Sequence, residues 1–363
     1  MSHNKDLTVE EIRLECSEGV TIAGQRWTKK ATEGEPNNAG RLLSDGTPKP
    51  SRIRILCFHG FLDNCRTFHL LAPFLIFGLD NVELVALDFP GHGLSSHKSL
   101  DSPPMIVINE TCYHMRDACR SLQWEDGFIL IGHSLGSIIA VIYAASFPEQ
   151  VQNLVLLDGY GPDNYEIFEM YVKGTLYMKG TGQKPGSSRP KGVVAERLQR
   201  HVQQRYDSNV RANVPNKRKR TYSSIHAAVQ ARVRTAELSP GRQWISMAAA
   251  LELVRRAVVV DDKYPRVRFR HDPRFNLPPL QLNTMEQVDV YWSQIRSKTL
   301  WLRAIDGWPF PTAFTDRAEA ILGDLGTVRY LPGSHHFHAD PDTADQVGRA
   351  VLEFILMSLG RSS

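Results

Sequence analysis

Residues 128–145 read FILIGHSLGSIIAVIYAA, and this stretch decides the fold. An apolar run comes first, then a turn in which Gly132 and Gly136 stand on either side of Ser134, and then a second apolar run. A buried strand, a sharp turn around one serine and a helix together make a nucleophile elbow. The glycines are needed because side chains at their positions would collide in so tight a turn. We therefore predict that Ser134 has a strained backbone and projects its hydroxyl above the end of a sheet.

Short apolar segments alternate with helical patterns on both sides of the elbow. Strands are predicted at residues 9–14, 20–27, 52–58, 82–87, 128–131, 153–157, 299–305 and 327–331. Helices are predicted at residues 67–75, 109–122, 137–145, 312–325 and 343–359. This alternation is typical of an α/β protein with a parallel sheet covered by helices on both faces.

One long segment, residues 159–298, interrupts the alternation between two predicted strands. It has helical patterns at 194–206, 223–235, 244–253 and 284–297, and no convincing buried strand. An insertion at the carboxyl edge of a parallel sheet lies over the crevice where ligands bind. We therefore predict a core domain of residues 1–158 and 299–363 and a helical cap of residues 159–298, with residues 181–220 as the least ordered part.

The composition fits a globular chain without a membrane span. The chain has 363 residues, 42% of them hydrophobic, which is ample for a large core. Its first residues contain no apolar signal core, and no apolar run reaches the roughly 18 residues that span a bilayer. Five cysteines show neither a C-x-x-C pair nor metal-ligand spacing, so we expect free thiols and a reducing compartment. The sequence thus predicts a cytoplasmic protein and leaves association with peroxisomes or vesicles open.

The formal charge of +4 is unevenly distributed. Residues 184–220 contain 11 Lys and Arg but only Glu196 and Asp207 as acids. Such a tract is found in nucleic-acid-binding segments, yet it is more often a solvated surface run. We therefore do not expect nucleic acid to be a partner.

The base that activates Ser134 must come from one of 13 histidines. The segment 332–341, Pro-Gly-Ser-His-His-Phe-His-Ala-Asp-Pro, follows the last predicted strand, which is where a chain with this elbow supplies its base. His335 is the predicted base, His336 is the close competitor, and His338 is expected to pack or bond beneath the loop. We expect no metal here, because the segment offers no carboxylate or cysteine ligand apart from Asp340.

Two aspartates qualify as the acid that orients the base. Asp158 and Asp306 each end an apolar strand, and each is followed by glycine. Both lie between Ser134 and His335 in the chain, so the order of residues leaves the choice open. One of the two is expected to be a loop aspartate at a strand end.

Backbone amides are expected to stabilise the oxyanion of the reaction. One is the amide of Leu135, the residue after the nucleophile. The other is predicted to be the amide of Phe61, which follows His59 and Gly60 at the end of an apolar strand. His92, in the glycine-rich turn 88–95, is expected to pack rather than to act in catalysis.

These segments together resemble the α/β-hydrolase superfamily and, more narrowly, its serine hydrolase-like family. The matching stretches are residues 58–64, 87–97, 132–137, 156–158, 270–274 and 332–335. The resemblance implies an eight-stranded, mostly parallel sheet with a helical cap and a Ser-His-acid triad. It favours Asp158 as the acid, because residues 303–306 lack the glycine of the G-x-x-D setting that many superfamily members place at Asp306.

The sequence thus predicts a cofactor-free serine hydrolase that acts on an ester-like small molecule, either a carboxylic ester or a thioester. The alternative is a catalytically silent protein of the same fold that binds a ligand without turnover, since a fold does not imply an activity. Neither the acyl group nor the oligomeric state is indicated.

Overall fold

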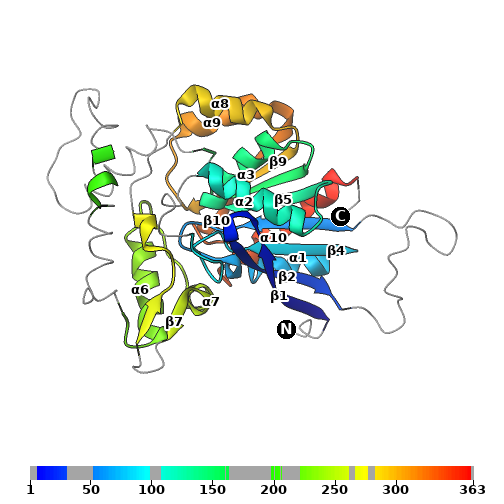
Figure 1. Ribbon diagram of the computed structural model, residues 1–363. Coiled ribbons are helices and arrows are strands. Elements are labelled where there is room, and N and C mark those ends of the chain that lie inside the picture. The colour runs from blue at the N-terminus through cyan, green and yellow to red at the C-terminus, as the bar shows by residue number, and fades with distance from the viewer. Residues whose placement is uncertain are drawn as a thin grey trace.

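The computed structural model describes residues 6–30, 52–98, 108–159, 161–162, 198–199, 201–204, 206, 221–260, 266–276 and 283–360 (Figure 1). Most of the predicted basic run 184–220 lies outside these residues, as do parts of the predicted helix 194–206.

An eight-stranded sheet forms the centre of the described structure, as the resemblance implied. Its strands are β1 (Leu7–Glu15), β2 (Thr21–Lys29), β3 (Ile53–Phe58), β4 (Val82–Leu87), β5 (Phe128–His133), β6 (Val151–Leu157), β9 (Lys298–Asp306) and β10 (Gly326–Ser334). Their order in the sheet is β1-β2-β4-β3-β5-β6-β9-β10. The β1–β2 and β2–β4 pairs are antiparallel, and all other pairs are parallel.

Helices cover both faces of the sheet, which confirms the predicted α/β class. They are α1 (Leu71–Gly78), α2 (Ile108–Ser121), α3 (Leu135–Ser146), α8 (Met285–Gln294), α9 (Thr312–Leu322) and α10 (Ala344–Ser358). Helices α2, α3, α8 and α9 share one hydrophobic cluster with the sheet, and α1 and α10 share the cluster on the opposite face (Figure 1). Helix α3 is buried continuously from Gly136 to Ala144, as a helix that is apolar on all sides must be.

Two predicted helices are shorter in the structure than in the sequence analysis. The predicted helix 67–75 is a 3-10 turn at Cys65–Phe68 followed by α1, which starts at Leu71. Pro73 explains the late start, because proline has no N–H to donate and fits only in the first turn of a helix. The predicted helix 312–325 is α9 up to Leu322 and then a 3-10 helix at Gly323–Leu325, because Gly323 has a φ of 51°.

The inserted segment contains a small second sheet in which only Val267 is buried, so the prediction of no convincing buried strand agrees with the structure. Helices α6 (Ile225–Glu237) and α7 (Met247–Ala257) pack with strands β7 (Val258–Val260) and β8 (Val267–Phe269), and this group lies at one end of the main sheet (Figure 1). The sequence analysis missed the strands because each has only three residues. Helix α8 contributes Val288 and Trp292 to the core cluster rather than to the α6–α7 cluster. The division at residue 298 stays a prediction.

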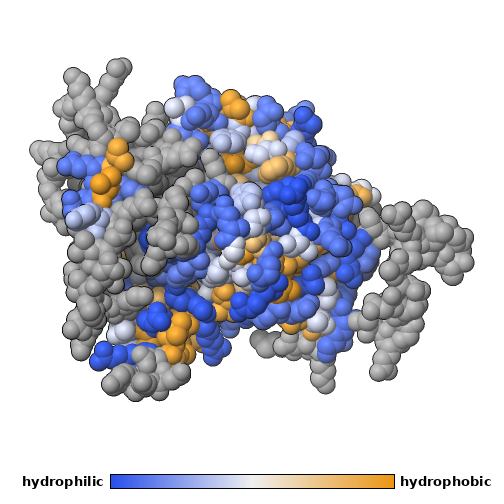
Figure 2. Space-filling model, viewed as in Figure 1, coloured by the Kyte–Doolittle hydropathy of each residue, from blue (hydrophilic) through white to orange (hydrophobic). Residues whose placement is uncertain are grey.

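Most of the molecular face in Figure 2 is hydrophilic, with a group of exposed hydrophobic residues over α6 and α7. The exposed large hydrophobic residues of this part of the chain include Met247 on α7 and Val260 on β7. All five cysteines lie within the described residues and are free, as predicted, and four of them are buried. Among the described helices, none is both long and apolar enough to span a membrane.

Candidate active site

Ser134 occupies a strained turn between β5 and α3. Its φ of 52° and ψ of −118° lie in a region that residues other than glycine rarely adopt. A Cβ at Gly132 would lie 2.5 Å from the carbonyl oxygen of Gly136, and a Cβ at Gly136 would lie 2.7 Å from that of His59. Both glycines are therefore required by close backbone approach, and Ser134 stays half-buried at the carboxyl end of β5.

The structure brings His335 and Asp158 together. His335 Nδ1 and Asp158 Oδ2 are 2.6 Å apart, and both residues are buried. Because the carboxylate accepts the hydrogen bond, Nδ1 of His335 carries the proton and Nε2 is left with a free lone pair. A histidine in this tautomer can accept a proton from a hydroxyl.

Backbone amides and a glycine fix the Asp158 carboxylate. The amide of Ala304 donates to Oδ1 at 3.1 Å, and the amide of Trp308 donates to Oδ2 at 3.0 Å. A Cβ at Gly307 would lie 2.5 Å from Oδ1 and 2.6 Å from Cγ of Asp158, so the carboxylate fits only because residue 307 is glycine. Asp306 lies opposite Ser334 in the β9–β10 register. Within the described residues, its carboxylate forms no hydrogen bond to His335.

The two predicted oxyanion donors are available for a ligand. Among the described residues, no protein group accepts a hydrogen bond from the backbone N–H of Leu135 or of Phe61. Leu135 is the first residue of α3, where the helix dipole adds a partial positive charge. The Phe61 side chain is 42% exposed, with its ring 6.5 Å from that of His92. His92 Nδ1 donates to the carbonyl of Pro90, which fits the packing role predicted for this residue.

The other two histidines of the base loop, residues 335–340, point away from Asp158. His336 Nε2 lies 3.0 Å from Oδ2 of Asp63, and His338 Nε2 lies 2.9 Å from Oγ1 of Thr67. His338 is fully buried, as predicted for a histidine beneath the loop. Burial lowers the pKa of both histidines below the usual value, so both are neutral.

His133 links the base loop to the elbow. Its Nε2 donates to the carbonyl oxygen of His335 at 2.9 Å, and the two rings lie 4.7 Å apart. Burial holds the pKa of His133 well below its usual value, so Nδ1 is unprotonated. His133 was not among the candidate site residues predicted from the sequence. No sequence signal indicated its contact with a residue 202 positions later.

Asp63, His133 and His336 form the one group of metal-ligating side chains found within the described part of the chain. Their ligand atoms lie within 4.8 Å of one another, and all three residues are buried. The carboxylate of this group therefore comes from Asp63, outside segment 332–341. However, Arg232 Nη2 lies 2.8 Å from Asp63 Oδ1 and 3.2 Å from His336 Nε2. The guanidinium already provides the positive charge that a metal ion would bring.

The segment that carries α6 and α7 contacts the base loop directly. The amide of Trp244 donates to Ser334 Oγ at 2.8 Å, and the amide of Ser246 donates to Asp340 Oδ2 at 3.2 Å. Farther along α7, Arg256 Nε donates to the fully buried Asp88 at 2.8 Å. These hydrogen bonds hold α7 against the core, and the first two lie next to His335.

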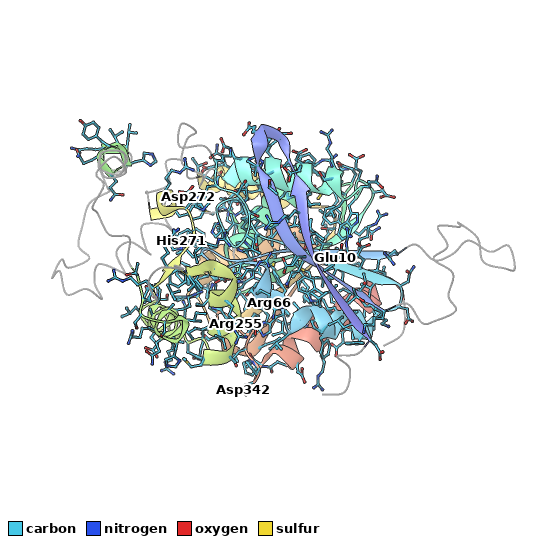
Figure 3. All side chains as sticks on the ribbon, turned by 60° about the horizontal axis from the view of Figure 1, so that its bottom comes forward. Glu10, Arg66, Arg255, His271, Asp272 and Asp342 are labelled. Atoms are coloured by element: carbon cyan, nitrogen blue, oxygen red, sulfur yellow. The ribbon has the colours of Figure 1, made fainter. Side chains whose placement is uncertain are left out.

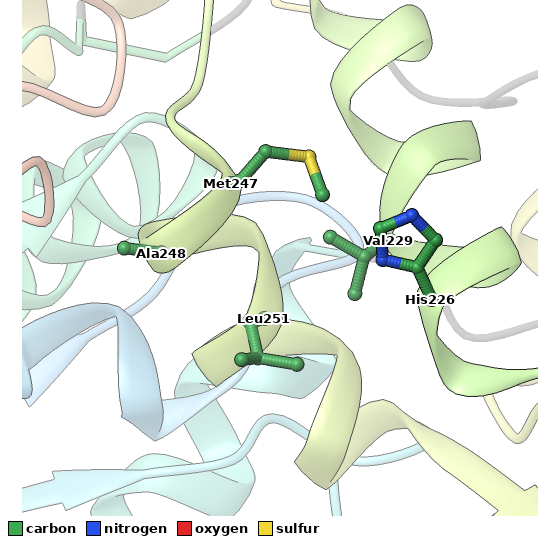
Figure 4. Close-up of a pocket in the computed structure, with 5 residues that line it drawn as sticks. All are labelled: His226, Val229, Met247, Ala248 and Leu251. Atoms are coloured by element: carbon green, nitrogen blue, oxygen red, sulfur yellow. The ribbon is translucent and has the colours of Figure 1, made fainter.

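Two ion pairs lie where α7 meets the core, and one pocket lies between α6 and α7. Figure 3 labels Arg66 and Arg255 where the core meets α7, and both form ion pairs with Glu252. A pocket of about 250 Å³ lies between α6 and α7, lined by His226, Val229, Met247, Ala248 and Leu251 (Figure 4). None of the residues discussed around Ser134 lines it, so it is separate from the candidate active site.

Known proteins share this fold and are similar in sequence over most of the chain. The family described as the alpha/beta hydrolase fold matches residues 53–245. A serine hydrolase-like protein of Danio rerio is 30% identical over 316 residues, which cover 84% of this chain and 82% of that protein. One from Dictyostelium discoideum is 25% identical over 95% of this chain and 81% of its own length. Among solved structures, a hypothetical protein of Pseudomonas aeruginosa PAO1 matches with a TM-score of 0.69 at 25% identity, covering 96% of this chain and 98% of that one.

A sheet of this topology with a serine elbow defines the class of α/β hydrolases. The chain belongs to the α/β-hydrolase superfamily and, within it, to the serine hydrolase-like family. This confirms the resemblance found in the sequence.

Proposed function

We propose that this protein is a serine hydrolase that cleaves a carboxylic ester or thioester of a small molecule through an acyl-enzyme intermediate. The observation that carries the proposal is the buried 2.6 Å hydrogen bond between His335 Nδ1 and Asp158 Oδ2. It fixes the one tautomer of His335 that can act as a general base. The names of the relatives support a serine hydrolase, and the free amides of Phe61 and Leu135 support acyl transfer.

In the proposed reaction, Ser134 Oγ attacks the carbonyl carbon and its proton moves to Nε2 of His335. The amides of Phe61 and Leu135 hold the oxygen that becomes negative, which is worth a few kcal/mol of barrier per donor. Asp158 stabilises the imidazolium through Nδ1 without taking its proton. As the intermediate collapses, Nε2 gives the proton to the leaving alcohol or thiol.

Water then completes the cycle. His335 Nε2 takes a proton from a water molecule, the hydroxide attacks the acyl carbon, and Ser134 leaves with the proton as the carboxylic acid is released. No cofactor enters this scheme. The cap is proposed to shape the acyl pocket, and the five free thiols support a cytoplasmic location.

A fluorophosphonate probe tests the nucleophile directly. We expect covalent labelling of the folded protein at Ser134, and none in Ser134→Ala. An ester and thioester panel of graded chain length then gives the preferred acyl group, with Ser134→Ala as the control. Saturable ligand binding without product, unchanged by Ser134→Ala, would instead indicate a catalytically silent binding protein.

Two matched substitutions test the acid. Asp158→Asn should lower kcat by about 10³–10⁴-fold, because an amide no longer stabilises the imidazolium and favours the wrong tautomer of His335. Asp306→Asn should leave kcat within about threefold, since its carboxylate does not bond to His335 within the described residues. A larger loss in Asp306→Asn than in Asp158→Asn would reverse the assignment.

A further inference from the structure

Asp63 is a buried carboxylate that the proposed reaction does not use, and it lies among groups that the reaction does use. It is 2% exposed and comes two residues after Phe61. The amide of Asp63 donates to the carbonyl of Gly60 at 3.2 Å, which closes the turn that presents the Phe61 amide. Asp63 is therefore part of the oxyanion loop, residues 60–63.

One oxygen of Asp63 holds the base loop. His336 Nε2 donates to Oδ2 at 3.0 Å, and His336 is the neighbour of His335 in the chain. The same oxygen lies 3.6 Å from Nδ1 of His133, the residue before Ser134. A Cβ at Gly60 would lie 2.9 Å from that Nδ1 and 3.0 Å from Oδ2 of Asp63, so the glycine lets these groups meet.

The other oxygen of Asp63 holds the cap. Arg232 Nη2 on α6 donates to Oδ1 at 2.8 Å, and the Arg232 side chain is 17% exposed. The 3.2 Å contact between Arg232 Nη2 and His336 Nε2 joins two donors, so both groups bond to the carboxylate rather than to each other. Burial alone would raise the pKa of Asp63, but the charge of Arg232 and the His336 contact hold it well below the usual value. The carboxylate is therefore ionised and accepts both bonds at neutral pH.

We propose that Asp63 is a positioning residue that holds the oxyanion loop and the base loop in a fixed position relative to each other. Because Arg232 lies on α6 and binds Asp63, this relative position depends on where α6 packs. Charge-assisted hydrogen bonds are short and directional, so one carboxylate can fix two loops and a helix at once. A geometric error of about 1 Å at reacting atoms can lower a rate by about 10²-fold. In its effect on turnover, this inference rests on the proposed hydrolase function.

The test uses the full-length protein and substitutions on α6. Arg232→Met removes the cap bond and leaves Asp63 and His336 in place. Arg232→Lys restores a donor and a charge, and Arg234→Met is the matched control because Arg234 is an exposed arginine on the same helix. With the preferred ester, we expect Arg232→Met to lower kcat about tenfold with KM changed less than twofold. Arg232→Lys should recover most of the loss, and Arg234→Met should match the wild type.

Hydrogen exchange gives a second readout that needs no turnover. The amide of Phe337 donates to the carbonyl of Ser334, and the amides of Ala339 and Asp340 donate to the carbonyl of His336, so all three should exchange slowly in the wild type. We expect them to exchange at least fivefold faster in Arg232→Met and at the wild-type rate in Arg234→Met. Equal exchange rates in the wild type, Arg232→Met and Arg234→Met would overturn the proposal. An Arg232→Met protein in which KM changes but kcat does not would also overturn it. If the wild-type protein shows no turnover with any ester or thioester, the proposed hydrolase function is refuted. The hydrogen-exchange comparison alone then tests whether Arg232 on α6 stabilises the base loop.

Discussion

Gly307→Ala tests whether the position of the Asp158 carboxylate controls the reaction. Gly307 has an ordinary backbone conformation, so alanine introduces no backbone strain there. Its N–H donates to the carbonyl of Ala304 at 3.1 Å, a bond that alanine keeps. The substitution therefore adds one methyl group beside Asp158 and changes nothing else.

The expected size of the effect follows from the lack of space at this position. The new Cβ would lie 2.5 Å from Oδ1 of Asp158, whereas real Cβ atoms essentially never approach within 3.0 Å, so the carboxylate or the loop must move by at least 0.5 Å. If the carboxylate moves away from His335 by this distance, the 2.6 Å hydrogen bond between them lengthens to about 3.1 Å. Since an error of about 1 Å costs about 10²-fold in rate, we expect kcat to fall by about 10- to 100-fold. This corresponds to about 1.4–2.7 kcal/mol of barrier.

The assay is steady-state hydrolysis of the preferred ester, with the rate of fluorophosphonate labelling as a second measure. KM should change less than twofold, because no contact to substrate is removed. Gly326→Ala is the control, because the atoms nearest to its Cβ would belong to the Leu322 side chain and the Gly323 carbonyl, at 3.0 Å or more. In an Asp158→Asn background, Gly307→Ala should cost little further, because both changes act on one interaction. A folded Gly307→Ala protein with kcat within twofold of the wild type would refute the reasoning.

Two further predictions concern stability. Arg256→Met should lower the free energy of unfolding by about 3–5 kcal/mol, because it leaves the buried Asp88 carboxylate without its cation. Arg255→Met, on the exposed side of α7, should cost less than about 0.5 kcal/mol in the same urea titration, and equal losses would contradict the role of Asp88. Stability should also fall between pH 7.5 and 5.5, because burial holds the pKa of three histidines well below the value of about 6.5 in the unfolded chain. Each unfolded histidine gains a proton below pH 6.5 that the native one does not, which costs about 1.4 kcal/mol per residue at pH 5.5. The three are His92, His133 and His338. A free energy of unfolding that is constant or rises toward pH 5.5 would rule this out.

The sequence predicted the fold well, because the features that define it are local. The eight strands were recognisable as short apolar runs, and the elbow was recognisable from Gly132 and Gly136, whose close contacts the structure confirms. The boundaries that were wrong have local causes too. Pro73 delays the start of α1, and Gly323 ends α9 early.

The candidate site was predictable only where chain order and strand ends indicate it. Ser134, His335 and both aspartates follow predicted strands, so their positions could be inferred. The choice between Asp158 and Asp306 depends on which carboxylate reaches His335, and this depends on the packing of three strands. Asp63 lies within the stretch 58–64 that resembles the family, but its partner His336 lies 273 residues later, and no local pattern encodes that contact.

The bonds from the Trp244 and Ser246 amides to Ser334 and Asp340 limit how this protein could be re-engineered. If the cap shapes the acyl pocket as proposed, a cap exchanged with one from a relative would bring a new pocket, but it would also have to offer two backbone donors at these places. Without them, two polar groups on either side of His335 would lose their partners, at a cost of about 1–3 kcal/mol each if they stayed buried. Chimeras in this family should therefore be joined so that residues 244–246 and 334–340 come from the same parent. Substrate range and catalytic competence would then be inherited together.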